Sequence, residues 1–346
     1  MERPGLTFAC ELDTRALSDL FADEALVVLL TQLRSRVSLG LVDLSAERAA
    51  VVRRLNEAGV PVVAWILLSP ADGYWCNAAN GPQAVARYAA LRVWTAEHGL
   101  RWAGIGIDIE PDLAEVQALI QGRIAAVAPR LLRRLFDGTR LRRAAAIYTT
   151  LVLQMHLDGY RVESYHVPFI VDERRVGATL LQRALGLVDV PTDREVLMLY
   201  TSLMGASGPG LLWSYGQEAE AIGVGSTGGG VELGVEAAPL AWPAFARDLR
   251  VARQLTDQIL VFSLEGCVQQ GFLSRLLDFD WDAPVAVPMR RVQWIDGVRR
   301  MARAVLWASV HPALILGSGA ALAGLIHLLV RWKFRSRPAS TTAQQR

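Results

Sequence analysis

The segment Trp102 to Pro111, WAGIGIDIEP, constrains the fold of this chain more than any other. Its residues alternate as along a β-strand, with isoleucines at 105, 107 and 109 and glycines or acids at 104, 106, 108 and 110. Large residues on one face and glycines on the other favour the wall of a closed barrel. Asp108 and Glu110 would then project inward near the carboxyl end of the strand. The alternative is that the two acids only cap the next helix. It is less favoured, because two inward acids on one strand are costly to bury without a function.

Seven further segments show strand patterns, and helical patterns separate them. Alternation of this kind predicts a parallel sheet, and eight strands predict an α/β fold of the (β/α)₈ TIM-barrel type. A doubly wound open sheet is the alternative, but no G-x-G-x-x-G follows the first strand. The predicted strands cover residues 6–13, 37–43, 60–68, 102–111, 161–168, 195–202, 222–226 and 258–265.

Composition limits the function classes. The 346 residues carry a formal net charge of +2 and are 52% hydrophobic, which allows one large domain with an appendage and gives no case for nucleic acid. The cysteines Cys10, Cys76 and Cys267 have no metal or redox spacing, so we expect reduced core thiols, no metal and no cofactor. The N-terminus has no long apolar core, and we therefore expect no signal peptide.

Acidic and aromatic residues recur near the carboxyl ends of the predicted strands. Carboxylates accept hydrogen bonds from sugar hydroxyls, and aromatic faces stack on sugar rings, so the pattern favours a cleft for a polyhydroxylated ligand. Trp75 and Asn77, in the loop after the third strand, would form a sugar-binding lid or simply a packed loop. The strand-end residues are Glu11, Asp43, Trp65, Asp108, Glu110, Glu163, Tyr165, Tyr200 and Glu265.

The segment GIGIDIEP resembles the strand 4 signature D-G-x-D-x-D-x-E of chitinase-like (family 18) glycoside hydrolases. Gly104, Asp108 and Glu110 match the glycine, the third aspartate and the catalytic glutamate, whereas Ala103 and Gly106 replace the first two aspartates. The resemblance implies that Glu110 protonates the leaving oxygen and that Asp108 orients the substrate. Tyr200 lies where the family has a tyrosine, although Thr201 replaces the aspartate after it, and Ser263 and Leu264 stand where strand 8 usually brings a tryptophan.

These observations predict a glycoside hydrolase-like barrel that acts on a glycan or glycoconjugate. Glu110 is the expected general acid, Asp108 would raise its pKa, and Glu265 or Glu163 would supply a second carboxylate. Glu11, Asp43, Trp65, Trp75, Asn77, Tyr165 and Tyr200 are the expected substrate-binding residues.

Two other functions stay open at this point. One is a carbohydrate-binding barrel without catalysis. The other is a metal-dependent phosphodiesterase, because CELDT at 10–14 is similar to the E-x-D of glycerophosphodiester phosphodiesterases. Those enzymes need histidines at strand ends, where only His166 is available. GSTGGG at 225–230 would cradle a phosphate or form a turn.

The C-terminal region predicts a membrane anchor. Residues 312–330 form a charge-free segment of 19 residues, which is close to the length of a bilayer-spanning helix. We therefore expect a barrel domain at 1–282, a basic juxtamembrane helix or linker at 283–311 and a short basic tail at 331–346. The expected partner is the lipid bilayer, crossed once, with the barrel in the cytoplasm. The opposite topology, with the barrel outside, is the alternative because arginines and lysines flank both sides of the span.

Overall fold

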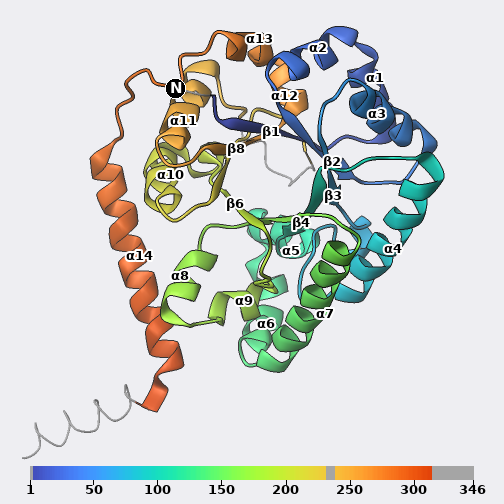
Figure 1. Ribbon diagram of the computed structural model, residues 1–346. Coiled ribbons are helices and arrows are strands. Elements are labelled where there is room, and N and C mark those ends of the chain that lie inside the picture. Colours follow the sequence, from blue (N-terminus) through green and yellow to red (C-terminus); the bar gives the residue numbers. More distant parts are fainter. Residues whose placement is uncertain (1–2, 231–237, 314–346) are drawn as a thin grey trace, which may run out of the picture.

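The computed structural model describes residues 3–230 and 238–313. Eight parallel strands form a closed barrel in sequence order, and the first and last strands pair with each other (Figure 1). Closure excludes the open doubly wound sheet and confirms the predicted TIM barrel. The strands are β1 Gly5–Cys10, β2 Arg36–Leu41, β3 Val62–Ile66, β4 Gly104–Ile109, β5 Val162–His166, β6 Arg194–Met198, β7 Ala221–Gly225 and β8 Gln258–Phe262.

Helices surround the barrel and cover its outer face (Figure 1). The helices are α1 Thr14–Ala22, α2 Glu24–Gln32, α3 Ala46–Glu57, α4 Gly81–His98, α5 Leu113–Ile120, α6 Ile124–Leu135, α7 Gly138–Leu157, α8 Ile170–Val176, α9 Leu180–Leu185, α10 Gly208–Gly216, α11 Trp242–Arg253, α12 Leu264–Gln269, α13 Phe272–Leu277 and α14 Met289–Val310, with 3-10 helices η1 Pro70–Asp72 and η2 Thr201–Ser207.

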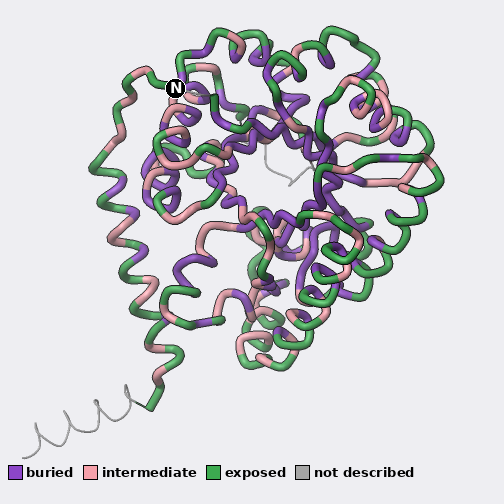
Figure 2. The backbone as a smooth tube through the Cα atoms, in the orientation of Figure 1, coloured by how far each residue is buried: buried purple, intermediate pink, exposed green. Residues whose placement is uncertain are grey.

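Side-chain alternation along the strands separates two cores. Outward residues such as Phe8, Leu39 and Ile107 pack with the helices in one large buried cluster. Inward residues such as Trp65 and Leu260 form a second, smaller cluster inside the barrel. Figure 2 shows the buried backbone, in purple, around the barrel and the exposed backbone, in green, on the outer helices. Six of the eight strands contribute to both clusters, whereas the inward residues of β2 and β4 are glycines or polar residues.

Polar residues at the carboxyl ends of the strands begin the next helices. Asp13 accepts a hydrogen bond from the backbone of Ala16 at the start of α1, and Ser45 accepts one from Arg48 at the start of α3. Such caps satisfy amide groups that a helix leaves unpaired at its first turn. The three cysteines are buried and free, as expected.

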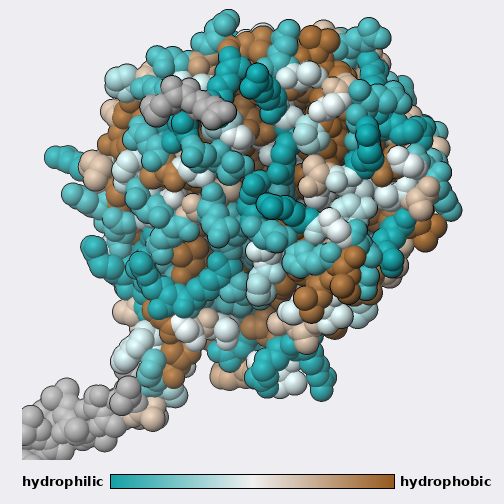
Figure 3. All heavy atoms as spheres, in the orientation of Figure 1, coloured by the Kyte–Doolittle hydropathy of each residue, from teal (hydrophilic) through white to brown (hydrophobic). Residues whose placement is uncertain are grey.

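Helix α14 lies along α10 and α8 on one flank of the barrel (Figure 1). Figure 3 shows hydrophobic atoms, in brown, near the place where the described part of this helix ends. Among residues 3–230 and 238–313, no helix is both long and apolar enough to cross a bilayer. The predicted span at 312–330 and the basic tail at 331–346 lie outside the described residues from residue 314 onward.

Candidate active site

A cavity of about 1090 Å³ opens at the carboxyl ends of the strands. Its volume is that of a site for a sizeable ligand. Three carboxylates line it, Glu11 after β1 and the pair Asp108 and Glu110 at the end of β4. Aromatic side chains from three strands, from the loop after β3 and from the segment after β6 also line the cavity, among them Trp65, Trp75, Tyr165, Tyr200 and Phe262.

The two acids of β4 differ in exposure. Asp108 is buried, with 2% of its surface exposed, and its Oδ1 has no hydrogen-bond partner among the described residues. Burial and the charges of Glu110 and Glu11 raise the pKa of Asp108 well above its usual range. Burial and the charge of Glu11 raise the pKa of the partly exposed Glu110 to about 8. At least one of the carboxyl groups of Asp108 and Glu110 therefore keeps its proton near neutral pH.

The loop between β3 and α4 fixes the end of β4. The amide of Cys76 donates to the carbonyl of Asp108 at 2.9 Å, and the amide of Glu110 donates to the carbonyl of Cys76 at 3.2 Å. Trp75 precedes Cys76, so the same pairing brings its ring to the cavity. The loop is thus part of the wall of the cavity.

Glu11 is held by two contacts from neighbouring segments. The hydroxyl of Tyr74 donates to its Oε1, and its backbone amide donates to Oε1 of Glu265 at 3.4 Å. Burial and the charge of Glu11 raise the pKa of Tyr74, so this phenol stays neutral and remains a donor. The neutral phenol therefore supplies a hydrogen bond to the carboxylate of Glu11.

Aromatic rings form the inner wall around the acids. Trp65 meets Tyr165 and Phe262 edge to face, with ring centroids 5.8 and 6.5 Å apart. Tyr200 lies 5.5 Å from Phe262. Burial and the charges of Asp108, Glu110 and Glu11 raise the pKa of Tyr200 well above its usual range, so it presents a neutral hydroxyl toward these acids.

Gly106 has no side chain, and this leaves the space that the ring of Tyr165 fills in the wall. A Cβ atom added to Gly106 would lie 2.6 Å from the hydroxyl of Tyr165, which donates to Glu163 at 2.8 Å and pairs with Ser38 at 2.6 Å. The glycine of β4 is therefore required by the neighbouring strand.

Replacing Gly106 with alanine is expected to lower the free energy of unfolding by about 1–3 kcal/mol, because the overpacked ring must leave its hydrogen bonds. Urea unfolding measures the change. Gly297→Ala in α14 is the matched control, since the nearest atom to its added Cβ is an arginine nitrogen at 4.0 Å. The control is expected to be neutral or to stabilise by about 1 kcal/mol. Equal stability of the two variants would contradict the close packing at Gly106.

Asp43 lies outside the cavity, and the expectation that it faces the mouth was wrong. It shares the outward parity of Leu39 and Leu41, and its Oδ2 pairs with the fully buried Arg48 of α3 at 2.9 Å. Hydrogen bonds from Arg48, Ser45 and other groups outweigh burial and lower the pKa of Asp43. Its role is to hold α3 against β2, because Arg48 also donates to the carbonyl of Gly40.

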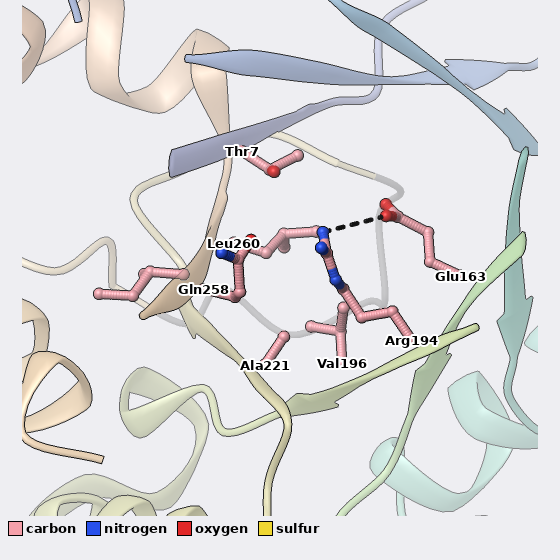
Figure 4. A pocket seen from close by; sticks show the side chains of 8 residues that line it. Thr7, Glu163, Arg194, Val196, Ala221, Gln258 and Leu260 are labelled. Atoms are coloured by element: carbon pink, nitrogen blue, oxygen red, sulfur yellow. Dashed lines mark ion pairs between the residues drawn. The ribbon is translucent and has the colours of Figure 1, made fainter. Parts of the chain in front are cut away.

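Glu163 lies at the amino end of the barrel, so the expectation that it shares the mouth with Glu110 was also wrong. It begins the inward face of β5 and pairs with Arg36 at 2.6 Å and with Arg194 at 3.9 Å. Figure 4 shows Arg194 reaching toward Glu163 across this end, beside Thr7 and Gln258. The carboxylate closes the floor of the barrel and is not among the residues that line the large cavity.

Glu265 and Asn77 are near the mouth but turned from the cavity. β8 ends at Phe262, and Glu265 lies in the first turn of α12, where burial raises its pKa. Neither residue is among those that line the cavity. Asn77 instead closes its own loop, accepting from the amide of Ala79 and donating to the carbonyl of Trp75.

The turn after β7 packs against carboxylates. A Cβ atom at Gly229 would lie 2.4 Å from Glu265, and one at Gly230 would lie 3.0 Å from Glu11. Negative charges at this distance oppose phosphate binding. Across the described parts of the chain, no three histidine, cysteine, aspartate or glutamate side chains group to hold a metal ion. His166 points outward from β5 and is buried, which lowers its pKa to about 4.

A second part of the cavity was not predicted from the sequence. Helix α14 and the segments after β5 and β6 bring apolar side chains to the cavity, among them Phe169, Leu203, Trp294 and Val298. The spacing of 294, 298, 301 and 305 places apolar residues on one helical face, and this signal was present in the sequence. Nothing in that spacing indicates which surface the face meets.

No family model matches this chain, and no curated protein matches it. Solved structures share the barrel at low identity. The PgaB (BpsB) glycoside hydrolase domain from Bordetella bronchiseptica is 13% identical, with a TM-score of 0.49 over 80% of this chain and 99% of that one. A GH18 chitinase from Pseudoalteromonas aurantia is 10% identical (TM-score 0.45, 79% and 98%), and a D-allulose 3-epimerase from Methylomonas sp. is 12% identical (TM-score 0.41, 86% and 99%). Likeness at this level says nothing about chemistry.

Proposed function

We propose that this chain is a glycoside hydrolase-like enzyme in which Glu110 is the general acid. The observation that carries the proposal is the pair of β4 acids in an aromatic cavity, with the pKa of Glu110 raised to about 8 by burial and by the charge of Glu11. Glycoside cleavage requires a carboxyl group that is protonated at working pH and that faces the scissile bond.

In the proposed reaction, Glu110 gives its proton to the glycosidic oxygen as the bond to the anomeric carbon breaks. Water supplies a hydroxyl group to that carbon, and its remaining proton restores Glu110. Glu11 is the carboxylate of the described cavity wall that would stabilise the positive charge that develops on the sugar ring, and Asp108, whose pKa burial raises, would orient the substrate as a hydrogen-bond donor. Glu11 takes the place that the sequence had suggested for Glu163 or Glu265, because those two carboxylates do not line the cavity.

The rings of the wall support a sugar as the ligand. Trp65, Trp75 and Tyr200 present apolar faces within the same cavity as the carboxylates. Sugars combine apolar ring faces with many hydroxyl groups, and a site with both kinds of partner complements them. The metal-dependent phosphodiesterase is not favoured, because the donor set that it needs is not assembled within the described residues.

The pH dependence of kcat/KM tests this assignment. Because the folded-state pKa of Glu110 is raised, the proton needed for catalysis is present below about pH 8 and is lost above it. We expect activity to fall about tenfold per pH unit on the alkaline side of this value. A panel of methylumbelliferyl glycosides and chitin oligosaccharides supplies the substrates. A profile that stays flat beyond pH 9 would reject Glu110 as the acid, and saturable sugar binding without turnover would favour the non-catalytic barrel.

A further inference from the structure

The cavity has two parts of different character. Its acidic part lies at β1 and β4, as described above. Its other part is lined by α14, α10, η2 and the segment before α8, and Arg299 is the only charged residue there among the described lining residues. The remaining side chains of this apolar part include Phe169, Leu203, Met204, Leu211, Trp294 and Val298.

The charge of Arg299 is already neutralised. Its Nη2 lies 3.0 Å from Oδ1 of Asp172 and 2.6 Å from Oε1 of Glu218, and only 4% of its side chain is exposed. Its guanidinium also stacks over the ring of Tyr215 at 3.8 Å, and Tyr215 donates to Asp172 at 2.7 Å. These groups have their partners within the protein, so the apolar part offers little to an anion or to a peptide backbone.

The apolar part continues onto the outer surface. Leu203, Trp294 and Val298 line the cavity and are also 56%, 56% and 44% exposed. Along α14, Met301 and Val305 extend the same face and are 70% and 61% exposed. From residue 294 to residue 305 this stripe is about 16 Å long, at the rise of an α-helix. A contiguous exposed apolar patch of this kind marks a binding surface.

We infer that the substrate is an amphiphilic glycoconjugate, whose sugar lies at the acids and whose hydrocarbon chain lies in the apolar part and along the α14 stripe. The inference rests on the proposed function and adds the class of the aglycone. A hydrocarbon covers Trp294 and Val298 without leaving any polar group unpaired. The expected membrane span at 312–330 begins two residues after α14 ends, which agrees with a substrate that is itself held in a bilayer.

Matched methyl and octyl glycosides of the same sugars test this inference. The full-length chain is held in phosphatidylcholine nanodiscs, and hydrolysis is measured below the concentration at which the octyl glycosides form micelles. We expect the octyl member of each hydrolysed pair to have a KM at least about 30-fold lower, because each buried methylene contributes a factor of about four. Equal KM values within the pairs would overturn the inference and leave the proposed hydrolysis intact.

Two variants distinguish hydrocarbon binding at the apolar part from hydrolysis at the acids. Val298→Asp places a charge at the rim and is expected to remove most of the octyl advantage, measured as the ratio of the KM values for the methyl and octyl members of each pair. Val93→Asp is the control, because Val93 is 58% exposed on α4, away from the cavity. If Val298→Asp weakens only the binding of the protein to vesicles, the stripe faces lipid and the inference is wrong. Absence of hydrolysis in every pair would instead count against the proposed function, and octyl binding is then read by calorimetry.

Discussion

Replacing Glu110 with glutamine is expected to lower kcat by about 10²–10⁴-fold, which corresponds to about 3–5 kcal/mol of transition-state stabilisation. Glutamine keeps the size of the side chain but carries no transferable proton. Below about pH 8 the protonated Glu110 and the glutamine are both neutral, so the fold should not lose stability. Steady-state hydrolysis and urea unfolding of the same preparation measure the two effects.

Glu163→Gln is the matched control for this experiment. Glu163 is also buried and inward, but it pairs with Arg36 at the opposite end of the barrel. We expect the control to keep kcat within a few-fold and to lose stability, which is the reverse of the result for Glu110. Wild-type activity in Glu110→Gln would show that the acid lies elsewhere in the cavity.

Replacing Asp172 with asparagine is expected to lower the free energy of unfolding by about 3–5 kcal/mol, because it removes the more deeply buried of the two carboxylates that pair with Arg299. Asp172 is 1% exposed and accepts hydrogen bonds from Arg299, Arg303 and Tyr215. These contacts attach α14 to the barrel, so the change should also loosen one wall of the cavity. Asp189→Asn is the control, since its pair with Arg174 is about one-third exposed on both sides and should contribute less than about 1 kcal/mol.

The effect of Asp172 depends on pH with a definite sign. Burial raises its pKa, but the hydrogen bonds from Arg299, Tyr215 and Arg303 outweigh burial, and the net pKa lies below the usual value. Its contribution to stability is therefore present above the unfolded-state pKa of about 3.9 and is lost as the pH falls through the lower folded-state pKa. The difference between wild type and Asp172→Asn should shrink below about pH 4. A constant difference across that range would exclude a role for the charge.

The local pattern of β4 predicted which of its residues face the cavity, and the alternation of eight strands with helices predicted the barrel. Ile105 and Ile107 face the helices, and Asp108 and Glu110 face the cavity, as the period of two requires. The same rule, applied strictly, would have excluded Asp43, because it shares the outward parity of Leu39. That error came from counting residues near a strand end without following its alternation.

The other differences between prediction and structure depend on where strands begin and end and on how helices pack, which the local sequence pattern does not specify. Glu163 has the inward parity, but it is the second residue of β5 and therefore lies at the amino end of the barrel. The exact start and end of the strand decide which end of the barrel such a residue faces. Glu265 was expected on β8, but the strand ends at Phe262 and the acid belongs to α12. Placement of Trp294 beside the cavity depends on how α14 packs on α10, which no local pattern specifies.

The location of α14 has a consequence for how such a protein diversifies. In barrel enzymes, specificity usually changes in the loops that also carry catalytic residues, so new specificity and lost activity are easily coupled. Here one wall of the cavity comes from a single helix of 22 residues that follows the whole barrel in the sequence. A recombination event after residue 288 would exchange that wall in one step and inherit all three carboxylates unchanged. Lineages that share this barrel can therefore exchange the part of the apolar wall that α14 supplies as a unit of inheritance separate from the acid chemistry.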